Sequence, residues 1–196
     1  MTRQASIGGM QARELEKQIP MTDILQKLKG GDRRSIGRVD EVIEAVRKEP
    51  SLFEDLFFGM LNDDPIIRMR SADAVEKITI TYPEHLNPFK KALLDIAARS
   101  QQQEIRWHLA QVFPRIKWKA EERKKIIDIL MAYLEDKSKI VKTFSMQALA
   151  EFALSDPKLR LRIIYILENL VKTGSPAMKS RGGKLLVRLK TSKGKG

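Results

Sequence analysis

Apolar residues recur in this chain at a fixed spacing of 37 residues, in three rows that run through four successive copies. Within each copy the three positions are four residues apart, which places them on one stripe of an α-helix. The rows are Leu52/Phe89/Ile126/Ile163, Leu56/Leu93/Leu130/Leu167 and Met60/Ala97/Leu134/Val171. Such a period is typical of stacked helical repeats, in which each unit buries its stripe only against its neighbours. The sequence therefore predicts an all-α fold, an α-α superhelix of stacked antiparallel helix pairs.

Prolines and capping residues place the helices within this period. A capping side chain precedes a proline at Asp64-Pro65, Asn87-Pro88, Asp156-Pro157 and Ser175-Pro176, and Ser51-x-x-Glu54 is a capping box. The outer helices are predicted at about 51–61, 88–99, 120–135 and 157–172. The inner helices are predicted at about 65–80, 103–117, 138–153 and 176–190. Pro114 predicts a kink in the second inner helix, and Gly182-Gly183 predicts close approach of helices in the fourth.

These helices are expected to form one domain over residues 1–196, with about four to five repeats. Four repeats cover 51–190, and residues 10–50 are predicted to form a degenerate N-terminal capping unit because they depart from the period. Within that unit a helix is expected at 35–48, with a weak partner at 24–28. The terminal segments 1–9 and 191–196 are predicted to be disordered.

The composition argues against several classes of function. Cysteine is absent, so disulfides and thiolate chemistry are excluded. The only histidines, His85 and His108, lack the spacing of a metal site, and no glycine pair forms a phosphate loop. We therefore expect a protein that is not an enzyme and that uses no metal and no cofactor. Without a signal-peptide pattern or a long apolar run, it is predicted to be cytoplasmic and not to bind a membrane.

The inner helices carry a pattern that resembles the HEAT-repeat family of armadillo-type α-solenoids, over residues of about 51–190. The turn Asp64-Pro65 is followed by Ile67-Arg68, Ala72, Ala74-Val75 and Ile78, and the pattern recurs from Ile105-Arg106, Val141-Lys142 and Met178-Lys179. The resemblance implies a HEAT-like solenoid that binds a partner on its concave face, which the inner helices form. It also implies that the basic row Arg68/Arg106/Lys142/Lys179 bonds acidic turn residues, with Asp64 serving Arg68. Ligand binding by that row is the alternative.

Charge divides the chain into unlike halves. Residues 1–100 hold 16 Lys/Arg and 16 Asp/Glu, whereas residues 101–196 hold 21 Lys/Arg and 9 Asp/Glu, which accounts for the whole net charge of +12. Such asymmetry favours a surface that meets an anionic partner. The alternative is a basic terminal helix that only keeps the end of the solenoid soluble.

Aligned inner helices place several rows on the predicted concave face. The rows are Arg70/His108/Phe144/Arg181, Asp73/Gln111/Gln147/Lys184 and Lys77/Arg115/Glu151/Arg188. The candidate partner-binding residues are the cations, the histidine and the aromatic side chain that these rows present to solvent: Arg70, His108, Arg115, Phe144, Arg181, Lys184 and Arg188. For Phe144 the alternative is a core position under a neighbouring helix.

These residues are compatible with three alternative functions. The first is a non-enzymatic scaffold that binds a protein partner, possibly an acidic one, through the concave face. The second is nucleic-acid binding by the basic C-terminal half, since Lys and Arg neutralise phosphates. Trp107, His108 and Trp118, around Pro114, suit an aromatic platform for a base or a peptide, with a core role as the alternative. A remote third is a glycosylase that resembles the HEAT-like alkylpurine DNA glycosylases, for which Asp73 and Glu151 are the nearest concave acids.

Overall fold

The computed structural model describes residues 20–31 and 35–192, and these residues form ten α-helices, α2 to α11, with short 3-10 turns and no strand. The predicted all-α class is confirmed. The predicted disordered ends lie outside the described residues over 1–9 and 193–196, as do residues 10–19 of the predicted capping unit. Thr191, by contrast, ends α11. In the ranges that the structure describes, no helix has the length and apolar character that crossing a bilayer requires.

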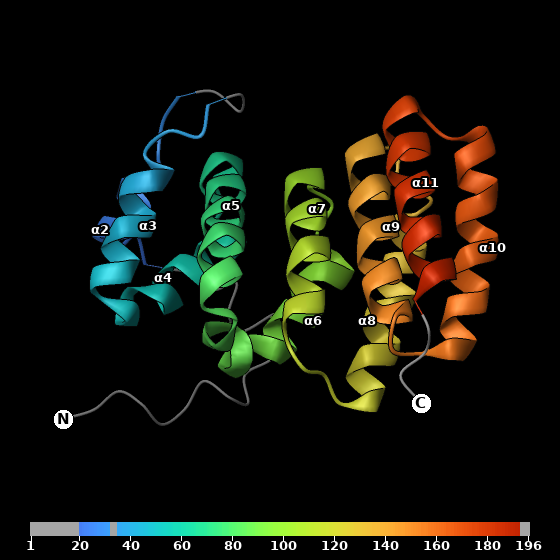
Figure 1. Ribbon diagram of the computed structural model, residues 1–196. Helices are drawn as coiled ribbons and strands as arrows, with labels where there is room; N and C mark the ends of the chain where they lie inside the picture. The colour runs from blue at the N-terminus through green and yellow to red at the C-terminus, as the bar shows by residue number, and fades with distance from the viewer. Residues whose placement is uncertain (1–19, 32–34, 193–196) are drawn as a thin grey trace. The chain divides into compact units, whose positions relative to one another are not determined.

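The chain divides into two compact units, Met1–His108 and Leu109–Gly196, with the boundary inside α7 (Gln103–Val112). The first unit holds α2 (Asp23–Gln26), α3 (Val39–Lys48), α4 (Phe53–Phe58), α5 (Pro65–Thr81) and α6 (Lys90–Arg99). The second holds α8 (Ala120–Tyr133), α9 (Lys139–Ala153), α10 (Pro157–Thr173) and α11 (Pro176–Thr191). In the first unit α5 packs against α3 and α4. In the second, α9 packs against α8, α10 and α11, and α10 packs against α11 (Figure 1).

The capping side chain starts the helix at three of the four predicted pairs of a capping residue and a proline. Asp64 accepts a hydrogen bond from the N–H of Ile66, Asp156 from Leu159 and Ser175 from Met178, which satisfies an otherwise unpaired helical donor in each case. The capping box at Ser51 was wrong, because Ser51 lies in the 3-10 turn Pro50–Leu52 and its hydroxyl donates to Glu49. The start at Asn87 was also wrong, because Pro83–Phe89 forms a 3-10 helix and α6 begins only at Lys90.

The central row of the 37-residue period forms the core of the helix pairs. Leu56, Leu93 and Leu130 are each 0% exposed, and Leu167 is 1% exposed. The two flanking rows are buried less completely, since Leu52, Phe89 and Val171 are only half-buried. The helical stripe predicted from the period is therefore the buried stripe in both units.

Arginines near helix starts bond backbone carbonyls at the ends of preceding helices. Arg68 donates to the carbonyl oxygens of Asn62 and Asp63 at 2.7 and 2.9 Å, and to the Gln102 side chain at 2.8 Å. The predicted partner Asp64 is thus not the acceptor. In the second unit, Arg160 likewise donates to carbonyls of Ala153 and Leu154. These side chains satisfy carbonyls that a helix end leaves without an intrahelical partner.

Pro114 ends the second inner helix early instead of kinking it. The α-helix stops at Val112 and a 3-10 turn follows over Phe113–Arg115, because the proline ring removes a donor and crowds the preceding turn. The chain then leaves in an extended conformation at Ile116. The indole N–H of Trp118 donates to the Phe113 carbonyl oxygen at 2.7 Å and satisfies part of the helix end.

Replacing the two neighbouring glycines of α11 with alanine is expected to change the stability of the protein in opposite directions. At Gly182 an added Cβ would lie 2.7 Å from Val171 Cγ2 and 3.1 Å from Met146 Cε, whereas at Gly183 it would meet nothing within 4 Å. Gly183→Ala should therefore raise the free energy of unfolding by about 0.5–1 kcal/mol through helix propensity. Gly182→Ala should lower it, because Val171 is β-branched and adapts poorly. Urea unfolding of both variants tests this, and the reverse order of stability would contradict the packing.

Candidate partner-binding groove

Arg70 does not face solvent, so the expectation that it does was wrong. Its side chain is 2% exposed, and its guanidinium donates to carbonyl oxygens of the turn between α2 and α3. The distances are 2.7 Å to Leu28, 2.6 Å to Gly30 and 3.1 to 3.2 Å to Ser35. Arg70 therefore holds the N-terminal helices against α5, and a partner cannot reach it in this conformation.

His108 is also buried, which corrects its predicted place on a solvent-facing row. It is 2% exposed, its ring stacks on Trp107 with the centroids 3.5 Å apart, and its Nε2 lies 4.0 Å from Asp73 Oδ1. Asp73 itself accepts from Lys77 Nζ at 2.9 Å. These contacts give His108 a packing role inside the first unit.

The second unit contains a groove of about 780 Å³ that gathers three of the candidate residues, Arg115, Phe144 and Arg181. One wall comes from the end of α7 and the 3-10 turn after it, through Gln111 and Arg115. The other wall is one side of α9, with Phe144, Gln147 and Glu151. Small or compact side chains at Ala110, Pro114 and Ala148 leave the space between the walls unfilled. The early end of α7 thus opens the groove.

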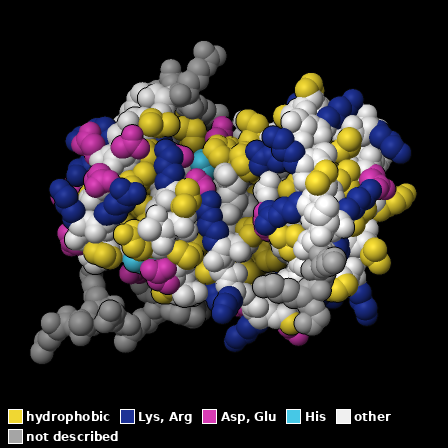
Figure 2. Space-filling view, viewed as in Figure 1, with side chains coloured by type: hydrophobic (Ala, Val, Ile, Leu, Met, Phe, Trp, Pro, Cys, Tyr) yellow, Lys and Arg dark blue, Asp and Glu magenta, His cyan; other side chains and the backbone are white. Residues whose placement is uncertain are grey.

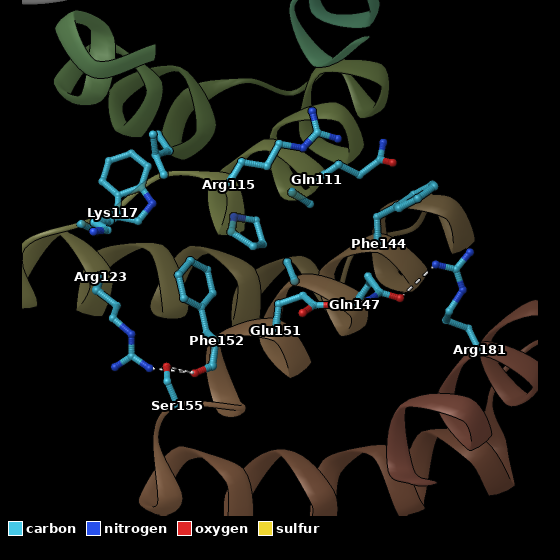
Figure 3. A pocket seen from close by; sticks show the side chains of 15 residues that line it. Gln111, Arg115, Lys117, Arg123, Phe144, Gln147, Glu151, Phe152, Ser155 and Arg181 are labelled. Atoms are coloured by element: carbon cyan, nitrogen blue, oxygen red, sulfur yellow. Dashed lines mark hydrogen bonds between the residues drawn. The ribbon is translucent and has the colours of Figure 1, made fainter. Parts of the chain in front are cut away.

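Positive charge dominates the lining of this groove. Four basic side chains reach it, and Glu151 is its single carboxylate; the basic residues are Arg115, Lys117, Arg123 and Arg181. Lys117 and Arg123 lie at one end, Phe144 and Arg181 lie at the other, and Glu151 lies between them (Figure 3). On the outer surface, Lys and Arg also predominate over Asp and Glu where α9 and α11 meet solvent (Figure 2).

A hydrogen-bonded network joins α9 to α11 along the groove. Arg181 Nη1 donates to Gln147 Oε1 at 3.0 Å, and Gln147 Nε2 donates to Glu151 Oε1 at 2.8 Å. Arg188 donates to the same Glu151 oxygen, and the guanidinium carbon of Arg181 lies 5.8 Å from the centre of the Phe144 ring. The network holds Phe144 and Arg181 at the groove end and compensates the charge of Glu151.

Lys184 and Arg188, the remaining candidates, do not line the groove. Arg188 forms an ion pair with Glu151, and Lys190 forms another with Glu168 at 2.7 Å. Lys184 is exposed on α11. The structure therefore divides the predicted site: Arg115, Phe144 and Arg181 line the groove, and the other four candidates do not.

The basic residues Lys117 and Arg123 of the groove were not predicted from the sequence. For Phe144 the sequence left open a solvent-facing position and a core position. Phe144 is half-buried, so it is neither a core residue nor a fully exposed one. Lys117 reaches the groove because the chain is extended after the 3-10 turn. Pro114, three residues before the predicted end of the helix, was the available signal for this exposure.

Arg123 is held at its end of the groove by an ion pair. It donates to Asp156 Oδ2 and to the Phe152 carbonyl oxygen, each at 2.9 Å. The pKa of Asp156 lies below its ordinary value, first because the carboxylate accepts the N–H of Leu159 and second because Arg123 bonds it. Ionised Asp156 therefore stabilises the fold at pH values above about 3.9, the pKa of an aspartate in the unfolded chain. This contribution is lost as the pH falls through the lower pKa that Asp156 has in the folded protein.

Asp156→Asn should therefore reduce stability in a way that depends on pH. Asparagine caps a helix about as well as aspartate, so the main loss is the pair with Arg123, worth about 0.5 kcal/mol for partly exposed side chains. The variant should be less stable than the parent protein at neutral pH, and this difference should disappear as the pH is lowered from about 5 to about 2. Urea unfolding at a series of pH values measures it, and a deficit that persists undiminished in acid would contradict the pairing.

Among the residues that the structure describes, no three His, Cys, Asp or Glu side chains lie close enough to hold a metal ion. Comparison of the chain with protein-family models, with curated proteins and with solved structures gives no match in any of the three. The groove and its charges are therefore the features of the molecule that indicate a function.

Proposed function

We propose that this chain is a non-enzymatic HEAT-like scaffold, a solenoid of stacked helix pairs, that binds an acidic protein partner through the groove of its second unit. The observation that carries the proposal is the groove itself, where Arg115, Lys117 and Arg181 surround a half-buried Phe144. Cations at the edge of an interface raise the rate of encounter, and an aromatic anchor slows release.

Contacts between successive copies support the solenoid part of the proposal. Gln147 bonds Arg181 and Glu151 bonds Arg188, residues 34 and 37 positions apart, as stacking of inner helices requires. The buried central row of leucines gives the same support in each unit. In such a stack, the inner helices α7, α9 and α11 provide the residues of the concave binding face.

A protein fits the groove better than a nucleic acid does. Glu151 lies between the two cationic ends, so a continuous phosphate backbone would have to pass a carboxylate (Figure 3). Arg181 already lies over the Phe144 ring, which limits the stacking of a base there. A peptide can instead place its carboxylates at the ends and its backbone N–H groups near Glu151.

Nucleic-acid binding is the second candidate, and a different surface favours it. Exposed cations stand on α10 and α11, outside the groove: Lys158, Arg162, Lys172, Lys179 and Lys184. Phosphate binding by these residues would weaken steeply with salt, whereas a contact anchored on Phe144 would weaken less. Salt dependence therefore separates the two candidates.

Capture of partners from the lysate of the source cell, before and after nuclease treatment, tests the proposal. The groove variant carries Arg115→Glu, Lys117→Glu and Arg181→Glu. The control carries Lys172→Glu, Lys179→Glu and Lys184→Glu, which make the same change in net charge on exposed positions of α10 and α11. Circular dichroism and melting must match the parent protein in both.

The parent and the control should retain a protein that resists nuclease, and the groove variant should lose it. Phe144→Ala should retain the same protein but release it faster, because an anchoring side chain governs residence time. Capture that nuclease abolishes, or that the control loses equally, would favour the nucleic-acid candidate and contradict the proposal.

A further inference from the structure

The length and polarity of the groove restrict the partner segment that can occupy it. Its α9 wall presents Phe144, Gln147, Ala148, Glu151 and Phe152, spaced three, four, seven and eight residues from the first. These residues form one side of the helix, and at 1.5 Å per residue they extend over about 12 Å. An extended peptide covers that length with about four residues.

The charges along the groove alternate in sign. Arg181 and Phe144 occupy one end, Lys117 and Arg123 occupy the other end, and Glu151 lies between them (Figure 3). Arg115 adds a cation on the opposite wall. A matching ligand has a carboxylate at each end, and an uncharged middle that can donate hydrogen bonds to Glu151.

Existing bonds leave the two ends unequal. Arg123 donates to Asp156 and to the Phe152 carbonyl oxygen, whereas the Lys117 side chain at the same end is exposed to solvent. At the other end, Arg181 uses Nη1 for Gln147 and packs its guanidinium near Phe144. That end therefore offers a cation beside an aromatic surface, which suits an acidic residue next to an apolar one.

We infer that the groove binds an extended segment of about five residues, with acidic side chains about four positions apart and an uncharged, partly apolar stretch between them. The inference rests on the proposed function and adds the length and register of the partner segment. The carboxylates lie toward Lys117 and Arg181, the backbone N–H groups face Glu151, and the apolar side chain packs beside Phe144.

Two synthetic peptides of the same composition test this register. The first, acetyl-Gly-Glu-Gly-Leu-Gly-Glu-Gly-amide, separates its carboxylates by four positions. The second, acetyl-Gly-Gly-Glu-Glu-Leu-Gly-Gly-amide, places them side by side. Titration into the full chain, followed by chemical shifts, should show tighter binding of the first by about fivefold, because the second can reach only one end with a carboxylate.

Variants at the two ends locate the binding. Lys117→Gln should weaken the first peptide by about fivefold and leave the second nearly unchanged, because the second binds through its adjacent Glu and Leu at the Arg181 end. Arg181→Gln should weaken both peptides. Lys184→Gln removes the same charge from an exposed position outside the groove and should leave both affinities within about twofold of the parent. An oligothymidylate of eight nucleotides serves as the phosphate probe.

Equal binding of the two peptides, or no binding of either, would overturn the assigned register. Tighter binding of the oligothymidylate, weakened by Arg181→Gln but not by Lys184→Gln, would overturn the peptide assignment in favour of a nucleic acid in the groove. The capture experiment above uses the natural partner and no peptide, so its success beside a failed titration would leave the proposed function and remove this inference alone.

Discussion

Replacing Arg70 with alanine is expected to lower the free energy of unfolding by about 3–5 kcal/mol, although the same residue looks from the sequence like a ligand contact. Arg70 is 2% exposed, and its guanidinium donates to backbone carbonyls that include those of Leu28, Gly30 and Ser35. Its removal leaves these acceptors without their donor, at a cost of about 1–3 kcal/mol for each that stays buried. Urea unfolding, followed by circular dichroism, measures the loss.

Two companion variants separate this effect from loss of charge. Arg70→Lys should recover only part of the stability, because one ammonium group cannot reproduce the fork that reaches several carbonyls. Arg99→Ala removes a charge from an exposed position and should change stability by about 0.5 kcal/mol or less. A fully stable Arg70→Ala variant would show that the segments 28–31 and 35–37 do not depend on this side chain.

Leu130→Ala should lower the free energy of unfolding by about 2–5 kcal/mol, since it leaves a cavity at a position that is 0% exposed. Leu130 belongs to the central row of the period and lies on α8, which packs against α9. The loss should appear as a lower urea midpoint with an unchanged slope.

A matched control exists on a helix of the same unit. Leu161 on α10 is 74% exposed, so Leu161→Ala makes the same chemical change without a cavity and should cost about 0.5 kcal/mol or less. If the two variants lost similar stability, the central row would not be the core of the repeat.

The helices and the core could be predicted because their signals are local or strictly periodic. A stripe of leucines spaced by 37 residues identifies its buried side without knowledge of the neighbours. Asp64, Asp156 and Ser175 cap helices through donors two or three residues away. The start at Asn87 failed because nearby prolines favoured a 3-10 helix, which the period does not reveal.

The burial of Arg70 could not be predicted because its partners are distant in the sequence. The carbonyl of Leu28 lies 42 positions away, and the turn that presents it bends through Gly30, Gly31 and Gly37, each with positive φ. Glycine adopts this conformation readily, and a Cβ at Gly37 would lie only 2.6 Å from the Arg70 guanidinium carbon. Helical periodicity carries no information about such a turn.

The candidate site could be predicted in part. Alignment of the inner helices correctly brought Glu151 beside Arg188, and it placed Arg115, Phe144 and Arg181 near one another. The alignment could not show that Arg188 forms an ion pair with Glu151. Nor could it show that the early end of α7 at Pro114 would bring Lys117 into the groove.

Photo-crosslinking in the source cell tests whether the groove contacts a protein. Benzoylphenylalanine replaces Lys117 in the groove of one variant and Leu161 on the outer side of α10 in another, both at exposed positions. We expect a protein adduct at position 117 that resists nuclease, that is absent at position 161 and that disappears when Arg181→Glu is added. An adduct that nuclease digests, or a protein adduct at position 161 with none at 117, would contradict binding of a protein in the groove.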